Sequence, residues 1–213
     1  MKKNKLLKNL LNIYIAVGLL LMMVAFAIFL LPLSPEIYYT LNTSATENEL
    51  SSLTQINSDL ETYLDKEKSS DEVYLPPIDE TLPKTNTLII PRIDLEGAIN
   101  EGVNPEEVLK NGIWRVNNFG TPEEKVPIIL ASHRFGYLSW DSDFRKNNSF
   151  YDLPKTQIGD KVIIIWNQRK YEYTITQVEE GTQISNYESD LILYTCKLFN
   201  SPIRIFRYAK LSK

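Results

Sequence analysis

The chain contains one cysteine and one histidine, and an arginine follows the cysteine closely. Cys196 ends the segment "LILYTC", His133 ends the segment "IILASH", and Arg204 begins "RIFRYA". A thiol nucleophile needs a partner that exchanges its proton, which histidine does near neutral pH. Acyl transfer also needs a positive or hydrogen-bonding group where the oxyanion develops, and arginine stays charged throughout. Together the three residues predict cysteine-dependent acyl transfer.

Each of these residues also has an ordinary explanation when it is taken singly. A lone histidine is more often a surface residue or a satisfied core residue, and an arginine is often part of a structural ion pair. Free cysteine is among the most buried residue types. Because Cys196 has no second cysteine to pair with, it is either buried and inert or present for its reactivity. The prediction therefore depends on the combination.

The elements that must position these residues are β-strands. Apolar or alternating segments predict strands at 87–90, 126–132, 161–166, 169–176, 191–195 and 204–211, with a turn at Asn167 and Gln168. A short helix is expected over 103–111, with Asn104 as N-cap, Pro105 at its first position and Gly112 after its end. Many short strands and few helices in one segment predict a closed or nearly closed β-barrel.

The last two predicted strands bear directly on the chemistry. Seven residues separate Cys196 from Arg204, so adjacent antiparallel strands would carry these two side by side. Arg207 is the competing arginine. Side chains alternate between the two faces of a strand, so Arg204 and Arg207 face opposite sides and only one of them can face the cysteine.

The N-terminus predicts a membrane anchor. Four lysines precede an uncharged run over 9–35, and its apolar core, 13–33, reaches about 30 Å as a helix, the thickness of a bilayer core. We expect a cytoplasmic basic tail at 1–9 and a transmembrane anchor at 10–33; a cleaved signal peptide is the weaker alternative. Basic residues before the run predict a single-pass protein of the cell membrane, with its N-terminus cytoplasmic and its catalytic domain extracellular.

A polar segment, 34–84, separates the anchor from the domain at 85–213, and we expect an extracellular stalk or linker there. Within it, Leu50, Leu53, Ile56, Leu60 and Leu64 form a helical stripe after a capping box of Ser44 and Glu47. The stripe predicts either a stalk helix that docks on the domain or another chain, or a partly helical spacer. Residues 71–84 contain prolines and predict an extended linker.

Charge and composition restrict the partners. A formal net charge of −4 argues against nucleic acid as a partner, because phosphate binding needs a basic surface. The acidic residues Glu179, Glu180, Glu188 and Asp190 form no recognisable metal-binding loop. We therefore expect neither a metal site nor a cofactor.

The order of these motifs resembles the sortase family. "LILYTC" is similar to the family's strand that ends in Thr-Cys, and "RIFRYA" is similar to the strand that its arginine opens. "ILASHR" matches the histidine segment, with Ser132 where the family usually has glycine. Further similarity covers "LIIPRIDLEGAI", "GVNPEEVLKNGIWRV" and "IGDKVIII", so the resemblance spans nearly all of 85–211.

The resemblance implies a mainly β fold, a closed sortase-type barrel with short helices. It implies a cysteine transpeptidase that cleaves an LPXTG-like sorting signal through a thioester and passes the acyl group to an amine of a cell-wall precursor or a pilin. His133, Cys196 and Arg204 would be catalytic, and Thr195 and Trp140 would bind substrate. Tyr137, Trp140, Phe150 and Tyr151 would either line the substrate groove or pack in the core.

Two other functions stay open at this point. One is a pilus-polymerising sortase, although 34–84 has no Asp-Pro-aromatic lid motif, which favours protein anchoring. The other is a membrane-tethered β-domain that binds peptides without catalysis and keeps Cys196 buried. An L,D-transpeptidase fits less well, because its histidine and cysteine lie close together, whereas 63 positions separate them here.

Overall fold

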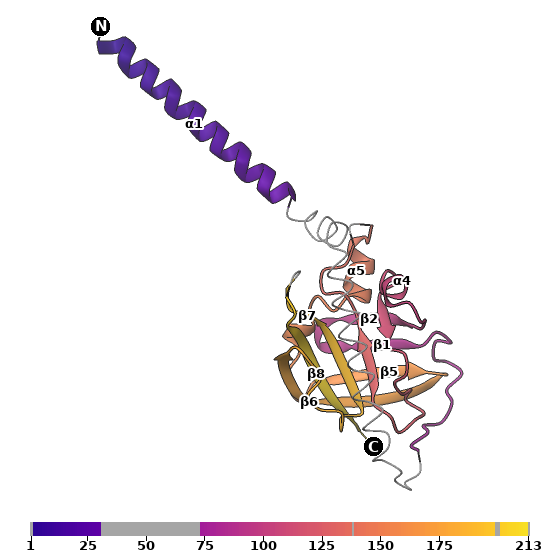
Figure 1. Ribbon diagram of the computed structural model, residues 1–213. Coiled ribbons are helices and arrows are strands. Elements are labelled where there is room, and N and C mark those ends of the chain that lie inside the picture. Colours follow the sequence, from indigo (N-terminus) through magenta and orange to yellow (C-terminus); the bar gives the residue numbers. More distant parts are fainter. Residues whose placement is uncertain (1, 31–72, 138, 199–200, 213) are drawn as a thin grey trace.

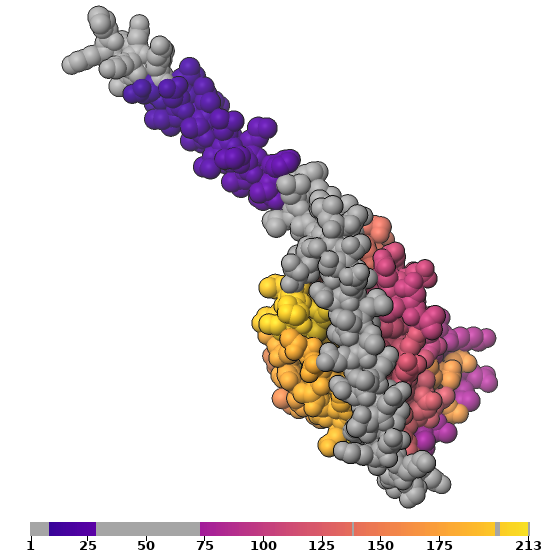
Figure 2. Space-filling model, viewed as in Figure 1, coloured from indigo at the N-terminus to yellow at the C-terminus, as the bar shows by residue number. Residues whose placement is uncertain are grey.

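A long N-terminal helix precedes a β-barrel (Figure 1). The computed structural model describes residues 2–30, 73–137, 139–198 and 201–212. Helix α1, Lys2–Leu30, contains the apolar span Asn9–Ile28, which is long and apolar enough to cross a membrane. None of this span is buried against the rest of the chain, and Figure 2 shows its side chains uncovered. The predicted stalk stripe and its capping box lie outside the described residues.

Eight strands close into a barrel in the order β1-β2-β3-β4-β7-β8-β6-β5, so the prediction of a mainly β, closed barrel is confirmed. The strands are β1 Thr87–Ile90, β2 Leu95–Asn100, β3 Ile113–Arg115, β4 Ile128–Ala131, β5 Lys161–Trp166, β6 Arg169–Gly181, β7 Leu191–Cys196 and β8 Arg204–Leu211. Strand β4 is shorter than predicted, and β6 is longer because a bulge between Ile175 and Gln177 lets the pairing with β8 continue. Strands β2 and β3 were not among the predicted strands.

Two strand pairings determine which strands lie next to each other around the site. Strand β4 pairs in parallel with β7, from Ile128 opposite Leu191 to Ala131 opposite Tyr194. Strand β7 pairs antiparallel with β8 along its whole length. The predicted turn at Asn167 and Gln168 joins β5 to β6, and both residues have positive φ, 50° and 57°. Such a turn follows the right-handed twist of its strands.

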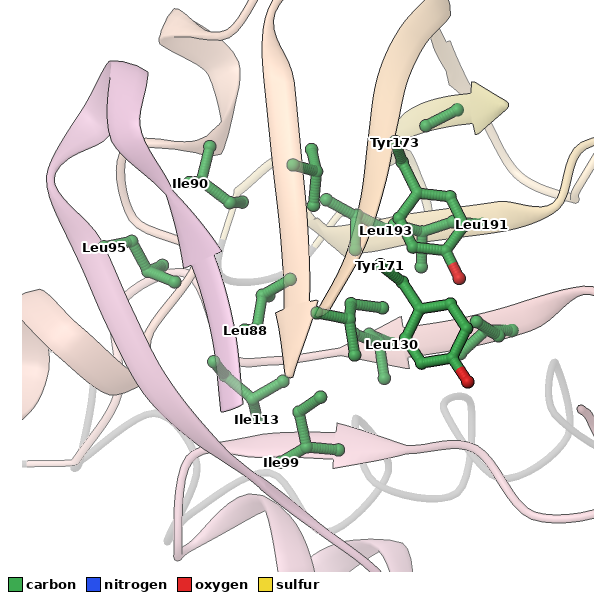
Figure 3. Close-up of a cluster of buried hydrophobic side chains, with 14 of the residues drawn as sticks. Leu88, Ile90, Leu95, Ile99, Ile113, Leu130, Tyr171, Tyr173, Leu191 and Leu193 are labelled. Carbon is green, nitrogen blue, oxygen red and sulfur yellow. The ribbon is translucent and has the colours of Figure 1, made fainter. Parts of the chain in front are cut away.

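The barrel interior is filled by apolar side chains from all eight strands, and Figure 3 shows part of this cluster. Its members include Leu88, Ile99, Ile113, Leu130, Ile164, Tyr171, Leu193 and Ala209. A second buried cluster lies on the outer faces of β3, β4, β7 and β8, with Trp114, Ile129, Ile192 and Phe206 among its members. Val108 and Leu109 of helix α4, Pro105–Leu109, cover this second cluster.

The short helices are held by their caps and by close contacts. Helix α4 begins after Asn104, whose side chain accepts a hydrogen bond from the Glu106 amide, as the sequence predicted, although the helix is shorter than 103–111. Helix α5, Ser142–Asn148, was not predicted because its residues are almost all polar. It lies on β2 where Gly97 leaves room, since a Cβ at Gly97 would meet the Asn147 carbonyl oxygen at 2.1 Å. The described residues also contain two single-turn helices, η1 Pro91–Ile93 and η2 Leu153–Lys155.

Candidate active site

The alternation of side chains along three strands places the three residues that the sequence predicted to be catalytic on the outer face of the barrel. On β7, Ile192 belongs to the outer cluster, and Cys196 is four residues further on the same face. On β8, Arg204 shares the outer face with Phe206. His133 continues the outer series of Ile129 and Ala131 just beyond the end of β4. All three therefore meet at the same edge.

Cys196 and Arg204 are direct cross-strand partners on β7 and β8. Both are almost buried, with 7% and 9% of their surface exposed. One Arg204 guanidinium nitrogen donates to the Ser201 carbonyl oxygen at 2.9 Å, which fixes the side chain at the start of its strand. A guanidinium has five N–H donors, so a bond to one carbonyl does not by itself prevent the group from binding an oxyanion or a substrate carbonyl. The sequence expectation that these residues lie side by side agrees with this register.

His133 reaches the same edge because β4 runs parallel to β7. The Ser132 amide donates to the Tyr194 carbonyl at 3.4 Å, and the Thr195 hydroxyl donates to the Ser132 carbonyl at 2.8 Å. These two bonds extend the pairing past the end of β4. The His133 carbonyl accepts from the Phe150 amide at 3.0 Å, and the residue is 4% exposed. Hydrogen bonds of the neighbouring backbone thus fix the position of the His133 backbone, from which the imidazole extends.

Two aromatic side chains enclose the His133 ring. Nε2 lies 3.1 Å from the Tyr137 hydroxyl, and the two rings meet edge to face with centroids 5.1 Å apart. The Trp140 ring lies 6.5 Å from the imidazole centroid. The imidazole therefore has a polar partner on one nitrogen and an aromatic wall beside it.

Arg134 joins the two halves of the site. Its guanidinium donates to the carbonyl oxygen of Lys197, so the residue after His133 binds the residue after Cys196. Its carbon centre also lies 5.2 Å above the Phe135 ring. The sequence reasoning gave Arg134 no role; the signal available was an arginine directly after the histidine, at a strand end that displays functional side chains.

A cavity of about 20 Å³ lies beside the cysteine and the histidine. Besides these two residues, its lining comprises Leu109, Trp114, Ala131, Ser132, Tyr194 and Thr195. This volume is enough for about one water molecule. A peptide chain therefore has to approach the thiol over the surface outside the cavity.

The other predicted site residues have partners that define their local roles. Thr195 is 2% exposed and lies on the strand face opposite Cys196, where its hydroxyl is bonded to Ser132. Trp140 is 8% exposed, and its indole nitrogen donates to the Lys110 carbonyl at 2.9 Å. The direct contact with substrate that the sequence suggested for both stays a prediction. The Ser132 hydroxyl, at the position of the family's usual glycine, donates to the Asn148 carbonyl at 2.8 Å.

Arg207 lies on the opposite face from Arg204, as the alternation predicted. It is 6% exposed and donates to the Thr156 hydroxyl at 2.8 Å and to the Pro154 carbonyl at 3.1 Å. Burial of Arg207 disfavours its charged form and so lowers the pKa of the guanidinium from its usual value. Arg207 is therefore a structural arginine that ties β8 to η2.

The acidic residues considered for metal binding are spread over ion pairs and hydrogen bonds. Glu180 pairs with Lys197, Asp190 pairs with Lys210 at 3.3 Å, and Glu179 accepts from Ser185. Within the described part of the chain, no three histidine, cysteine, aspartate or glutamate side chains are grouped so that they could hold a metal ion.

A thiol, an imidazole and a guanidinium thus lie at one edge of a closed barrel, and these are the groups that cysteine-dependent acyl transfer needs. The family profile for the sortase domain matches residues 88–212, and the chain belongs to the sortase family. None of the curated proteins compared with the chain matches it.

Several solved sortase structures are similar to the chain. Sortase C1 of Streptococcus agalactiae is 21% identical, with 64% of this chain and 71% of that chain covered and a TM-score of 0.50. Sortase D5 of Clostridium perfringens is 21% identical, covering 64% and 83%, with a TM-score of 0.49. Sortase A of Listeria monocytogenes is 19% identical, covering 62% and 89%, with a TM-score of 0.48.

Proposed function

We propose that the protein is a membrane-anchored transpeptidase that cuts an LPXTG-like sorting signal and joins the acyl part to an amine, attaching proteins to the cell wall. The observation that carries this proposal is the register of Cys196 with Arg204, next to His133 at the end of the parallel strand β4. Membership of the sortase family supports proteins with sorting signals as the class of substrate.

The chemistry divides into two acyl transfers. His133 takes the proton of the Cys196 thiol, and the sulfur attacks the scissile carbonyl to form a tetrahedral oxyanion, which the Arg204 guanidinium stabilises. As the C–N bond breaks, His133 gives a proton to the leaving amine, and a thioester on Cys196 remains. An incoming amine then attacks the thioester, gives its proton to His133, and the sulfur leaves. A cell-wall precursor or a pilin lysine would supply this amine.

Helix α1 suits the anchoring part of the proposal. Its span Asn9–Ile28 has the length and composition of a membrane-crossing helix, although a signal sequence has the same properties. The basic residues before it favour a cytoplasmic N-terminus and an extracellular barrel. Determining which side of the membrane the barrel occupies, by protease protection of intact cells and of inverted vesicles, tests this topology.

The activity is tested with the full-length chain in detergent micelles, an LPXTG-type peptide and triglycine. We expect a ligated peptide and, by intact-mass spectrometry without the amine, an acyl adduct on the protein. Because Cys196 is the only cysteine, Cys196→Ala removes every thiol and should abolish both. Adduct formation by Cys196→Ala would exclude the nucleophile, and the absence of any product across a sorting-peptide library would exclude the reaction.

The alternative functions differ in their products. A pilus-polymerising sortase would ligate the peptide to a pilin lysine in preference to triglycine. A non-catalytic binding domain would bind the peptide without an acyl adduct, and Cys196 would react with a methanethiosulfonate reagent no faster than a buried thiol. Because only 7% of the Cys196 surface is exposed, a reaction faster than that of a buried thiol would indicate that the thiol is activated.

A further inference from the structure

We infer that Tyr137 is a positioning residue for His133: its hydroxyl holds Nε2 of the imidazole, so that the other nitrogen, Nδ1, exchanges the proton with the leaving amine. This inference rests on the proposed function, because it assigns an atom to the proton transfer. The contact that carries it is the 3.1 Å separation between His133 Nε2 and the Tyr137 oxygen.

The hydrogen bond fits both protonation states of the ring. In the imidazolium, both nitrogens carry a proton, and Nε2–H donates to the tyrosine oxygen. When Nδ1 gives its proton to the leaving amine, the neutral ring that remains still carries its proton on Nε2. The bond to Tyr137 is therefore kept through the reaction, and the imidazole does not have to rotate between the two acyl transfers.

The loop that carries Tyr137 is built to hold it in place. Arg145 of α5 donates to three carbonyls of this loop, those of Phe135, Tyr137 and Trp140, with distances of 2.9 Å and 3.2 Å to the last two. One guanidinium thus fixes the backbone on both sides of the tyrosine side chain. Such a fixed support is what positions a catalytic ring within a fraction of an ångström.

Gly136 and Trp140 complete the support. Gly136 has φ of +72°, and a Cβ there would meet the Trp140 ring at 2.2 Å, so only glycine permits this packing. The indole is itself held by the Lys110 carbonyl, and its ring lies 5.5 Å from that of Tyr137. The tyrosine ring therefore has an aromatic wall behind it that limits its rotation.

Kinetics give the first test, with the full-length chain in detergent. Tyr137→Phe removes one oxygen and keeps the ring, so we expect kcat to fall about fivefold, the value of one neutral hydrogen bond, with KM unchanged. Tyr74→Phe is the control, because it removes the same oxygen from a tyrosine that is 42% exposed and lies outside the loop that carries Tyr137. We expect the control to keep the wild-type kcat.

A spectroscopic test does not depend on turnover. The chain has one histidine, so ring ¹⁵N labelling reports on His133 without further assignment. The charged and titratable side chains of the surrounding elements, Arg134, Cys196 and Arg204, stay unchanged in Tyr137→Phe. We expect the neutral wild-type ring to carry its proton on Nε2, and the Nε2–H signal to move in Tyr137→Phe but not in Tyr74→Phe.

Two results would overturn the inference. One is a neutral wild-type ring with its proton on Nδ1, and the other is the same Nε2 signal in wild type and Tyr137→Phe. If the Nε2 signal moves as expected while the wild type makes no product from any sorting peptide, the positioning contact stands and the proposed reaction fails. The two proposals are therefore tested separately.

Discussion

The Arg134 guanidinium binds the carbonyl oxygen of Lys197, and this bond joins the loop after the candidate base to the loop after the candidate nucleophile. The backbone pairing of β4 with β7 ends at Ala131 and Tyr194, two residues before His133 and Cys196. Beyond these residues, the Ser132 amide still donates to the Tyr194 carbonyl, and side-chain bonds add to this backbone bond. Arg134 donates one of them from the segment after β4, and the Thr195 hydroxyl donates the other from β7.

Removing the Arg134 bond should impair catalysis more than folding. We expect Arg134→Met to lower kcat/KM by about tenfold to a hundredfold, because small misplacements of reacting groups are costly. Loss of stability should be about 1 kcal/mol, the value of one hydrogen bond. Lys197→Ala is the control, since it leaves the carbonyl acceptor in place. Equal kcat/KM for Arg134→Met and Lys197→Ala would show that the bond is not needed.

Thr195 should be important for stability. Thr195→Val is nearly isosteric and leaves the Ser132 carbonyl without the hydroxyl that binds it at 2.8 Å, so we expect the free energy of unfolding to fall by about 1–2 kcal/mol. Urea unfolding measures this loss, and Thr195→Ser, which keeps the hydroxyl, should recover most of it. A raised KM at unchanged stability would instead support the substrate contact that the sequence suggested.

The two arginines of β8 should separate activity from stability. Arg204→Lys keeps the charge but loses the planar fork, and we expect kcat/KM to fall about a hundredfold at unchanged stability. Arg207→Lys loses the bonds to Thr156 and Pro154 and should reduce the free energy of unfolding by about 2 kcal/mol. Its kcat per folded molecule should stay close to that of the wild type. If Arg204→Lys instead lowers stability and Arg207→Lys instead lowers kcat/KM, the roles assigned to the two arginines are wrong.

Alkaline pH should destabilise the barrel through its buried tyrosines. Burial, with a smaller contribution from Glu123, raises the pKa of Tyr171 to about 12. A tyrosine in the unfolded chain loses its proton near pH 10, so between about pH 10 and 12 the folded state binds the proton more tightly. The stabilisation is complete below about pH 10 and is lost as the pH rises toward 12. Urea unfolding at several pH values measures this loss.

Tyr171→Phe should reduce that alkaline loss. Within the described part of the chain, the buried Tyr171 hydroxyl has no hydrogen-bond partner, so its removal should leave the free energy of unfolding at pH 7 unchanged or raise it. Tyr208→Phe is the matched comparison, because the Tyr208 hydroxyl accepts from the Ser185 amide at 3.0 Å. We expect that variant to be destabilised at pH 7. A Tyr171→Phe variant with the wild-type alkaline sensitivity would contradict the assignment.

Much of the barrel could be predicted because its patterns are local. Strands β1, β5 and β8 have the predicted bounds, since each is a run of β-forming residues between clear breaks. Strand β2, "LEGAIN", contains a glycine and polar residues, and β3 has three residues, so neither has a strong pattern of its own. They form because the barrel supplies their neighbours.

Part of the candidate site could also be predicted from local patterns, and part could not. The seven-residue connection predicted that Cys196 and Arg204 lie side by side, and the alternation on β8 allowed only one of Arg204 and Arg207 to face the cysteine. The resemblance of "RIFRYA" to the sortase strand favoured Arg204. The contacts of Arg134, Tyr137 and Arg145 depend on a loop whose path no local pattern specifies. Sequence reasoning grouped Tyr137 with residues that line a groove or pack the core, and its bond to His133 required the structure.

The parallel pairing of β4 with β7 also orders the assembly of the site during folding. Cys196 and Arg204 belong to one hairpin, β7–β8, whose short connection can close early. His133 joins them only after β4 has paired with β7, and these strands lie far apart in the chain. We expect this pairing to form slowly, because closing the long loop between the strands costs entropy before the new contacts compensate for it. A partly folded chain would thus bring the thiol beside the arginine before the imidazole reaches them. His133, the proposed proton-transfer partner, joins the site when the barrel closes, so we expect an incompletely folded chain to have an incomplete site.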